Sequence, residues 1–133
     1  MTDIKVLFDH ATAVMQKAYA PYSKFYVGAC IEATSGKLYA GCNVENAAYG
    51  LTTCAEACAI CAMIVGSDAK INQIAVITSG SGMTAPCGAC RQRIHEFATP
   101  DTLVHLGNLK GDRVTYHLSE LLPHAFSMSD LTK

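Results

Sequence analysis

The spacing of hydrophobic residues changes repeatedly along the chain, between the period of about 3.6 residues of amphipathic helices and the short apolar runs of buried strands. This pattern predicts helices over residues 3–19, 55–65 and 86–97, and strands over residues 25–34, 38–44, 74–77, 103–106 and 114–118. Residues 55–65 are apolar almost throughout and end at Gly66, which is typical of a helix buried on most sides. The order of the elements predicts an α/β fold, a three-layer α/β/α sandwich on a five-stranded mixed sheet.

The length and composition favour one soluble domain over residues 1–133. Hydrophobic residues make up 50% of the chain, and the net charge is −1 with only 16% charged residues. The chain therefore lacks the basic surface that nucleic-acid binding requires, and we expect a small substrate that is not polyanionic. No apolar run approaches the roughly 20 residues of a membrane span, and the first residues do not resemble a secretion signal. We expect a cytoplasmic protein with no membrane partner.

Two short motifs hold the residues best suited to chemistry, Cys54-Ala55-Glu56 and Pro86-Cys87-Gly88-Ala89-Cys90. The chain has seven cysteines, and in a reducing cytosol such thiols bind metals more often than they form disulfides. The three motif cysteines offer three thiolates to one Zn²⁺ ion, which leaves the fourth tetrahedral position open for water, as in catalytic zinc sites. The glutamate adds a carboxylate next to the first thiolate, so the motifs indicate catalysis.

Both motifs also have structural interpretations that the sequence leaves open. Thr53 and Glu56 match the Ser/Thr-x-x-Glu capping box, in which the glutamate only closes the first turn of a helix. The pair Cys58-x-x-Cys61 and the pair Cys87-x-x-Cys90 together match a closed four-cysteine zinc site. Their separation is longer than in zinc ribbons, and the first pair lies within an apolar helix, which disfavours this second interpretation.

The charge of a three-cysteine site raises a further question. Three thiolates and Zn²⁺ carry one net negative charge, which makes the bound water less acidic unless neighbouring groups compensate. The N-termini of the helices that begin near Cys54 and Pro86 favour thiolate and supply part of this compensation. Arg91 is another candidate. The remaining cysteines Cys30 and Cys42 are expected in the core, and the five histidines on the surface or in packing roles.

Together the motifs resemble the small homotetrameric zinc-dependent cytidine deaminases, whose signature joins a cysteine or histidine, any residue and glutamate to a later Pro-Cys-x-x-Cys. Further segments similar to that family are Ala20-Pro21-Tyr22-Ser23, Gly41-Cys42-Asn43-Val44-Glu45-Asn46-Ala47 and Cys90-Arg91-Gln92. The resemblance covers most of the chain. It implies a cytidine deaminase-like fold, one Zn²⁺ per chain, and hydrolysis of cytidine and deoxycytidine to uridine and deoxyuridine with release of ammonia, in pyrimidine salvage.

The same resemblance implies a role for each site residue. Zinc would turn water into the hydroxide that attacks C4 of cytosine, and the ligands would be Cys54, Cys87 and Cys90. Glu56 would carry the proton of this water to N3 and then assist the departure of the amino group. Phe25 would stack on the pyrimidine, Asn43 and Glu45 would bind the ribose hydroxyls, and the base would lie beside Ala55 and residues 84–86. In a homotetramer, neighbouring subunits would complete each site with Ala47, Tyr49 and Phe126.

One position departs from that family, in which many tetrameric members have arginine directly after the motif glutamate. This chain has Ala57 there. The guanidinium group that would neutralise the thiolates is missing, and we expect helix dipoles or another cation to replace it.

Three functions agree with these motifs. The first is a deaminase of free nucleosides, which explains the most residues. The second keeps the fold and the chemistry but acts on a cytosine-bearing antibiotic or on a base within a nucleic acid, and the neutral charge disfavours a polynucleotide. The third is a zinc-stabilised binding module without enzymatic activity, in which Glu56 is only a helix cap and four protein ligands close the metal site.

Overall fold

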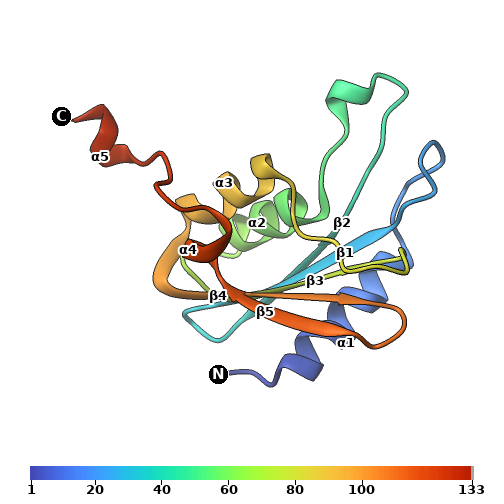
Figure 1. Ribbon diagram of the computed structural model, residues 1–133, viewed down its shortest axis with the longest axis horizontal. Coiled ribbons are helices and arrows are strands. Elements are labelled where there is room, and N and C mark those ends of the chain that lie inside the picture. The colour runs from blue at the N-terminus through green and yellow to red at the C-terminus, as the bar shows by residue number, and fades with distance from the viewer. Residues whose placement is uncertain (133) are drawn as a thin grey trace.

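The computed structural model describes residues 1–132 and shows a five-stranded sheet with helices on both faces (Figure 1). The strands are β1 (Val27–Ala33), β2 (Leu38–Cys42), β3 (Ile71–Thr78), β4 (Ala98–Asn108) and β5 (Arg113–His117). The helices are α1 (Ile4–Met15), η1 (Tyr49–Leu51), α2 (Ala55–Val65), α3 (Gly88–Glu96), α4 (Leu118–Leu121) and α5 (Met128–Leu131). No helix within residues 1–132 has the length and apolar character that a membrane span needs.

The order of the strands is β2-β1-β3-β4-β5, and only β3 and β4 run parallel while the other neighbours are antiparallel. Helix α1 lies on one face of this mixed sheet, and α2 and α3 lie on the other. The predicted three-layer α/β/α sandwich is therefore confirmed.

Helix α1 packs closely on the sheet. It begins at Asp3, whose side chain accepts a hydrogen bond from the Lys5 backbone nitrogen at 2.8 Å, as N-cap aspartates do. Gly28 of β1 permits the close approach, because a Cβ atom there would lie 2.0 Å from the carbonyl oxygen of Ala11. The helix ends at Met15, earlier than the predicted end at residue 19. The apolar residues buried between α1 and the sheet are Leu7, Phe8, Ala11, Met15, Cys30, Ala75 and Ile77.

Helix α2 packs on the opposite face and spans the predicted range 55–65. Its residues Ala55, Ala59 and Met63 are completely buried. Gly41 of β2 lies directly beneath the helix, because a Cβ atom there would lie 2.4 Å from the Ala59 nitrogen. This close contact fixes the N-terminus of α2 on the sheet, where it faces the N-terminus of α3.

A buried polar network lies on the α1 side of the sheet, around Gln73 of β3. The Gln73 Oε1 atom lies 2.8 Å from Nε2 of His105, and Gln73 Nε2 donates to the Thr2 carbonyl at 2.8 Å and to Glu32. Nδ1 of His105 lies 2.7 Å from the Thr115 hydroxyl. Burial lowers the pKa of His105, which keeps the ring neutral near pH 7. His105 is thus a packing histidine, one of the two roles expected.

Candidate active site

Three cysteine thiols meet where the N-termini of α2 and α3 face each other. Cys54 is the N-cap residue of α2, Cys87 is the N-cap residue of α3, and Cys90 lies in the first turn of α3. Their Sγ atoms all lie within 4.8 Å of one another, and no second cluster of this kind occurs within residues 1–132. Three soft thiolates on rigid helix ends suit Zn²⁺.

The alternative four-cysteine site is wrong for this structure. Cys58 and Cys61 both lie within α2, beyond its first turn, and neither belongs to the thiol cluster. The Cys61 side chain is exposed. Of the two cysteines expected in the core, Cys30 is buried and Cys42 is half-buried.

The three thiols differ in their electrostatic environment. Backbone N–H groups of Cys90 and Ala89 donate to Cys87 and lower its pKa, as expected for a thiol at the N-terminus of a helix. Burial raises the pKa of Cys54 and of Cys90. Because zinc binds thiolates, zinc binding at this cluster would release protons from Cys54 and Cys90.

Glu56 lies in the first turn of α2, next to the cluster. Its side chain is only 5% exposed. Burial raises its pKa, while the Cys90 thiol and the Arg93 charge act in the opposite direction. The capping-box interpretation is wrong, because the N-cap residue is Cys54 rather than Thr53 and no side-chain hydrogen bond caps the helix. A buried carboxylate with a raised pKa, beside a metal-binding cluster, has the properties of a general acid or base.

A cavity of about 240 Å³ opens onto the cluster and Glu56. It reaches the carboxyl end of β3, the edge of a sheet at which α/β proteins bind ligands. Most of the predicted contact residues line it, together with Val27, Thr52, Val76 and Thr78, which the sequence analysis missed. The predicted residues among them are Phe25, Asn43, Ala55, Thr84, Ala85 and Pro86.

Thr78 stands out among these lining residues. Its side chain is 2% exposed, and its hydroxyl oxygen is the one buried side-chain polar atom in residues 1–132 without a hydrogen-bond partner. Buried polar groups are nearly always paired. The hydroxyl therefore remains available to a molecule bound in the cavity. A lone threonine at a strand end gives no sequence signal, so only the structure identifies it.

Asn43 and Glu45 were predicted to act together, and the structure places them differently. The Asn43 amide lines the cavity and holds the start of β1, since its Nδ2 donates to the Phe25 carbonyl at 2.8 Å and its Oδ1 accepts from the Val27 nitrogen at 2.9 Å. Glu45 instead lines a neighbouring hollow, where it accepts hydrogen bonds from the backbone nitrogens of residues 22 and 23. Thr52 lines both the cavity and this neighbouring hollow.

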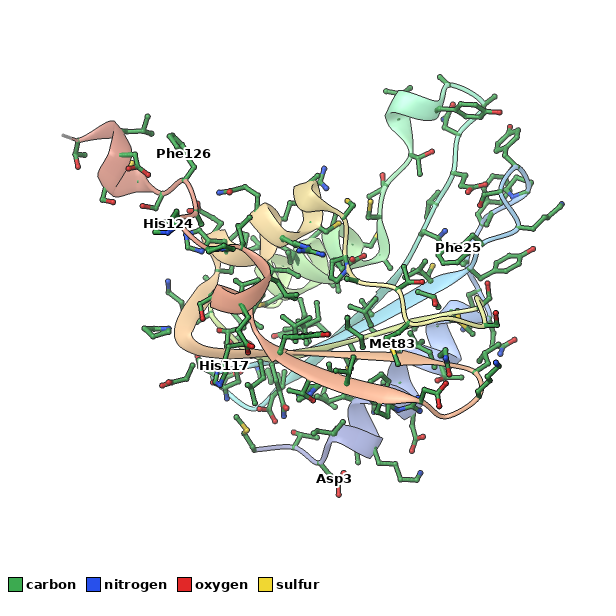
Figure 2. All side chains as sticks on the ribbon, viewed as in Figure 1. Asp3, Phe25, Met83, His117, His124 and Phe126 are labelled. Carbon is green, nitrogen blue, oxygen red and sulfur yellow. The ribbon has the colours of Figure 1, made fainter. Side chains whose placement is uncertain are left out.

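The residues expected to act across subunits lie outside the cavity of their own chain. Ala47 and Tyr49 lie on the exposed loop between β2 and α2, and Tyr49 is 75% exposed with its ring edge-on to Tyr22 at 6.0 Å. Phe126 is 57% exposed on the C-terminal tail. Figure 2 shows Phe126 far from Phe25, on the segment that extends away from the sheet.

Two arginines of α3 have different surroundings. The Arg91 guanidinium donates to the carbonyl oxygens of Pro86 and Leu121, both at 2.8 Å, so it joins α3 to α4. Arg93 Nη1 instead donates to Cys90 Sγ at 3.7 Å. The sequence analysis named Arg91 as a possible partner of the thiolates and missed Arg93. The i,i+3 spacing of Arg93 from Cys90 on a helix was the available signal.

Comparisons with known proteins agree with this site. The family model described as the cytidine and deoxycytidylate deaminase zinc-binding region matches residues 1–106. A cytidine deaminase of Sporosarcina psychrophila is 42% identical over 130 residues, which is 98% of this chain and 96% of that protein. The crystal structure of cytidine deaminase from Burkholderia pseudomallei is similar with a TM-score of 0.89 and 42% identity, over 94% of this chain and 100% of that chain. The crystal structure of cytidine deaminase from Mycobacterium tuberculosis is similar with a TM-score of 0.84 and 35% identity, over 96% of this chain and 100% of that chain.

Proposed function

Because this chain belongs to the cytidine and deoxycytidylate deaminase family, we propose that it converts cytidine and deoxycytidine to uridine and deoxyuridine by hydrolysis, in pyrimidine salvage. The observation that carries this proposal is the buried carboxylate of Glu56, which lines one cavity together with the three clustered thiols. A single domain over residues 1–133 performs the reaction. The enzyme works in the cytoplasm, where reducing conditions keep its seven cysteines as thiols.

The reaction divides between the metal and the protein. One zinc ion per chain, held by Cys54, Cys87 and Cys90, supplies the Lewis acidity that makes water nucleophilic at neutral pH. Glu56 accepts a proton from the attacking water and delivers it to N3 of the cytosine ring. The oxygen bonds to C4, the bond from C4 to the exocyclic nitrogen breaks, and the remaining water proton leaves with that nitrogen as ammonia.

The cavity residues hold the nucleoside beside Glu56. Phe25 offers an aromatic face to the pyrimidine. The Asn43 amide binds the ribose with its second N–H and its second lone pair, because each end already makes one backbone hydrogen bond. Glu45, which lines the neighbouring hollow, binds a ribose hydroxyl from that side. Ala55 and residues 84–86 border the base.

The direct test is the loss of cytidine absorbance near the ultraviolet maximum with zinc-loaded protein. Rapid loss, with uridine and ammonia formed in equal amounts, is the result expected. If a protein with one zinc per chain leaves both cytidine and deoxycytidine unchanged, the proposal fails, and the cytosine-bearing antibiotics become the substrates to assay.

Thr78→Val is expected to raise the KM for cytidine roughly 2- to 10-fold, the contribution of one hydrogen bond. Valine keeps the size of the side chain but removes the unpaired hydroxyl, so the melting temperature should not fall. Thr102→Val is the matched control, because the buried Thr102 hydroxyl donates to the Ile71 carbonyl at 2.7 Å away from the cavity. That control should lose stability and keep its KM. An unchanged KM and kcat in Thr78→Val would show that the hydroxyl does not contact the substrate.

We also propose that the active enzyme is a homotetramer with shared sites. The cavity of one chain is smaller than the roughly 300–1,000 Å³ of typical small-molecule sites. Large apolar side chains remain exposed on the loop before α2, at the end of α2 and on the C-terminal tail, and such exposure is typical of association surfaces. They include Tyr49 (75%), Leu51 (69%), Val65 (86%), Phe126 (57%) and Met128 (69%). Light scattering should give four times the chain mass of 14.1 kDa.

Mixing two inactive variants tests the shared site. Phe126→Ala removes the aromatic group that a neighbouring pocket needs, and Glu56→Gln removes the proton carrier of its own pocket. Each variant alone should lose most of its activity. Tetramers formed from both chains should regain part of it, because a chain with intact Glu56 can then receive Phe126 from its neighbour. No recovery in verified mixed tetramers would assign Phe126 to its own chain or to packing alone.

A further inference from the structure

The zinc site concentrates negative charge in a partly buried place. Three thiolates exceed the charge of one Zn²⁺ ion, and ionised Glu56 adds to this excess beside the Cys90 thiol. Cys90 is 1% exposed and Glu56 is 5% exposed. A buried charge is costly unless an opposite charge or a hydrogen bond compensates it. Backbone N–H groups already donate to Cys87, so the buried Cys90 sulfur is the atom that most needs a cation or a further donor.

Few residues can supply that cation. Ala57, directly after Glu56, has no charge to offer. The guanidinium of Arg91 is already bound to two carbonyl oxygens and ties α3 to α4. Arg93 is the cation whose charge acts on both Cys54 and Glu56, and its Nη1 donates directly to Cys90 Sγ at 3.7 Å.

We propose that Arg93 is a positioning residue of the zinc site, which donates to Cys90 Sγ and offsets the excess negative charge of the three thiolates. An arginine at position 57 of α2 would neutralise the thiolates, but this chain has alanine there, and Arg93 supplies the positive charge from α3 instead. A donor to a thiolate also fixes the direction in which the sulfur presents its lone pairs, so Arg93 holds the ligand that α3 buries most deeply. Of the proposed function, this inference requires only that Cys54, Cys87 and Cys90 bind zinc.

Arg93 also has a simpler interpretation. It lies with His95 in the last turn of α3, where a positive charge is favourable to the helix dipole, and its side chain is largely exposed. In that interpretation Arg93 contributes slightly to folding stability and nothing to the metal. Zinc affinity separates the two interpretations, because a charge at a helix end has no effect on a thiolate ligand unless it reaches the sulfur.

The experiment is a zinc titration of reduced, zinc-free protein against a competing chromophoric chelator. Arg93→Gln keeps a hydrogen-bonding side chain without the charge, and Arg93→Lys keeps the charge. Lys5→Gln is the matched control, because it removes one positive charge from an exposed pair with Asp9 on α1, on the opposite face of the sheet. Melting temperatures of the zinc-free proteins show that each variant is folded.

Arg93→Gln is expected to weaken zinc binding about 10- to 100-fold, as is typical for residues that support a metal ligand. Arg93→Lys should recover most of this loss, and Lys5→Gln should bind zinc as the wild type does. The proposal is overturned if Arg93→Gln binds as tightly as Lys5→Gln, or if the lysine variant recovers nothing. These outcomes are independent of catalysis, since a zinc-loaded wild type that fails to deaminate cytidine would end the proposed function and leave the titration valid.

Discussion

Glu56→Gln is expected to lower kcat for cytidine about a thousandfold, within the range of about 10² to 10⁴ for loss of a general acid–base group. Glutamine has nearly the same shape and can still form hydrogen bonds, but it cannot take a proton from water or return one to N3. The loss should appear in kcat rather than in KM, because the proton moves only as the transition state forms. Zinc content, measured by atomic emission, should remain at one ion per chain.

The stability of the same variant gives a second, independent readout. Glu56 is 5% exposed, and its raised pKa reflects the cost of burying the charged carboxylate. Neutral glutamine removes that cost, so the melting temperature of Glu56→Gln should equal or exceed that of the wild type, as happens where a functional site sacrifices stability.

Glu96→Gln is the matched control for Glu56→Gln. Glu96 is the last residue of α3 and is exposed, so the same change of charge there should leave both kcat and melting temperature nearly unchanged. A kcat for Glu56→Gln within tenfold of the wild type would remove Glu56 from the chemistry.

The fold was predictable where apolar spacing alone determines an element. Helix α2 matches the predicted range 55–65 at both ends, because its apolar run, interrupted only by Glu56, begins after Cys54 and stops at Gly66. Strand β3 is longer than the predicted residues 74–77, since it begins at Ile71 and includes Asn72 and Gln73. Gln73 is 1% exposed because His105 and Thr2 satisfy its amide. Partners that distant in sequence are invisible to hydropathy, so the prediction ended where the polar residues began.

The candidate site was predictable where a motif specifies the chemistry. The three cysteines and Glu56 were identified from two short segments, and the structure brings them to one place. Thr78 and Arg93 were not identified, because their importance depends on which atoms the fold places next to them. Thr78 matters because nothing pairs its hydroxyl, and Arg93 because a helix turn carries it to Cys90. Residue type and spacing give no information on the unpaired Thr78 hydroxyl, whereas the i,i+3 spacing of Arg93 from Cys90 was a signal that the sequence analysis did not use.

Replacement of a proposed zinc ligand should lower deaminase activity as much as Glu56→Gln does, but through loss of the metal. Cys90→Ala is expected to weaken zinc binding by more than the roughly 10- to 100-fold typical of residues that only support a ligand. The reason is that Cys90 is 1% exposed at the centre of the cluster, where no described side chain outside the cluster offers a replacement thiolate. Deamination should be lost together with the metal, and excess zinc should restore it only in part.

Thermal unfolding with and without zinc measures the weakening of zinc binding independently of enzymatic activity. A ligand that binds only the folded state raises the melting temperature in proportion to the logarithm of its concentration over its Kd. Zinc should therefore stabilise the wild type strongly and Cys90→Ala weakly. Cys58→Ala is the matched control, because it removes a half-buried thiol of α2 that lies outside the cluster. If Cys58→Ala lost zinc as readily as Cys90→Ala, the metal would have four cysteine ligands, no position would remain for water, and the hydrolytic mechanism would fail with it.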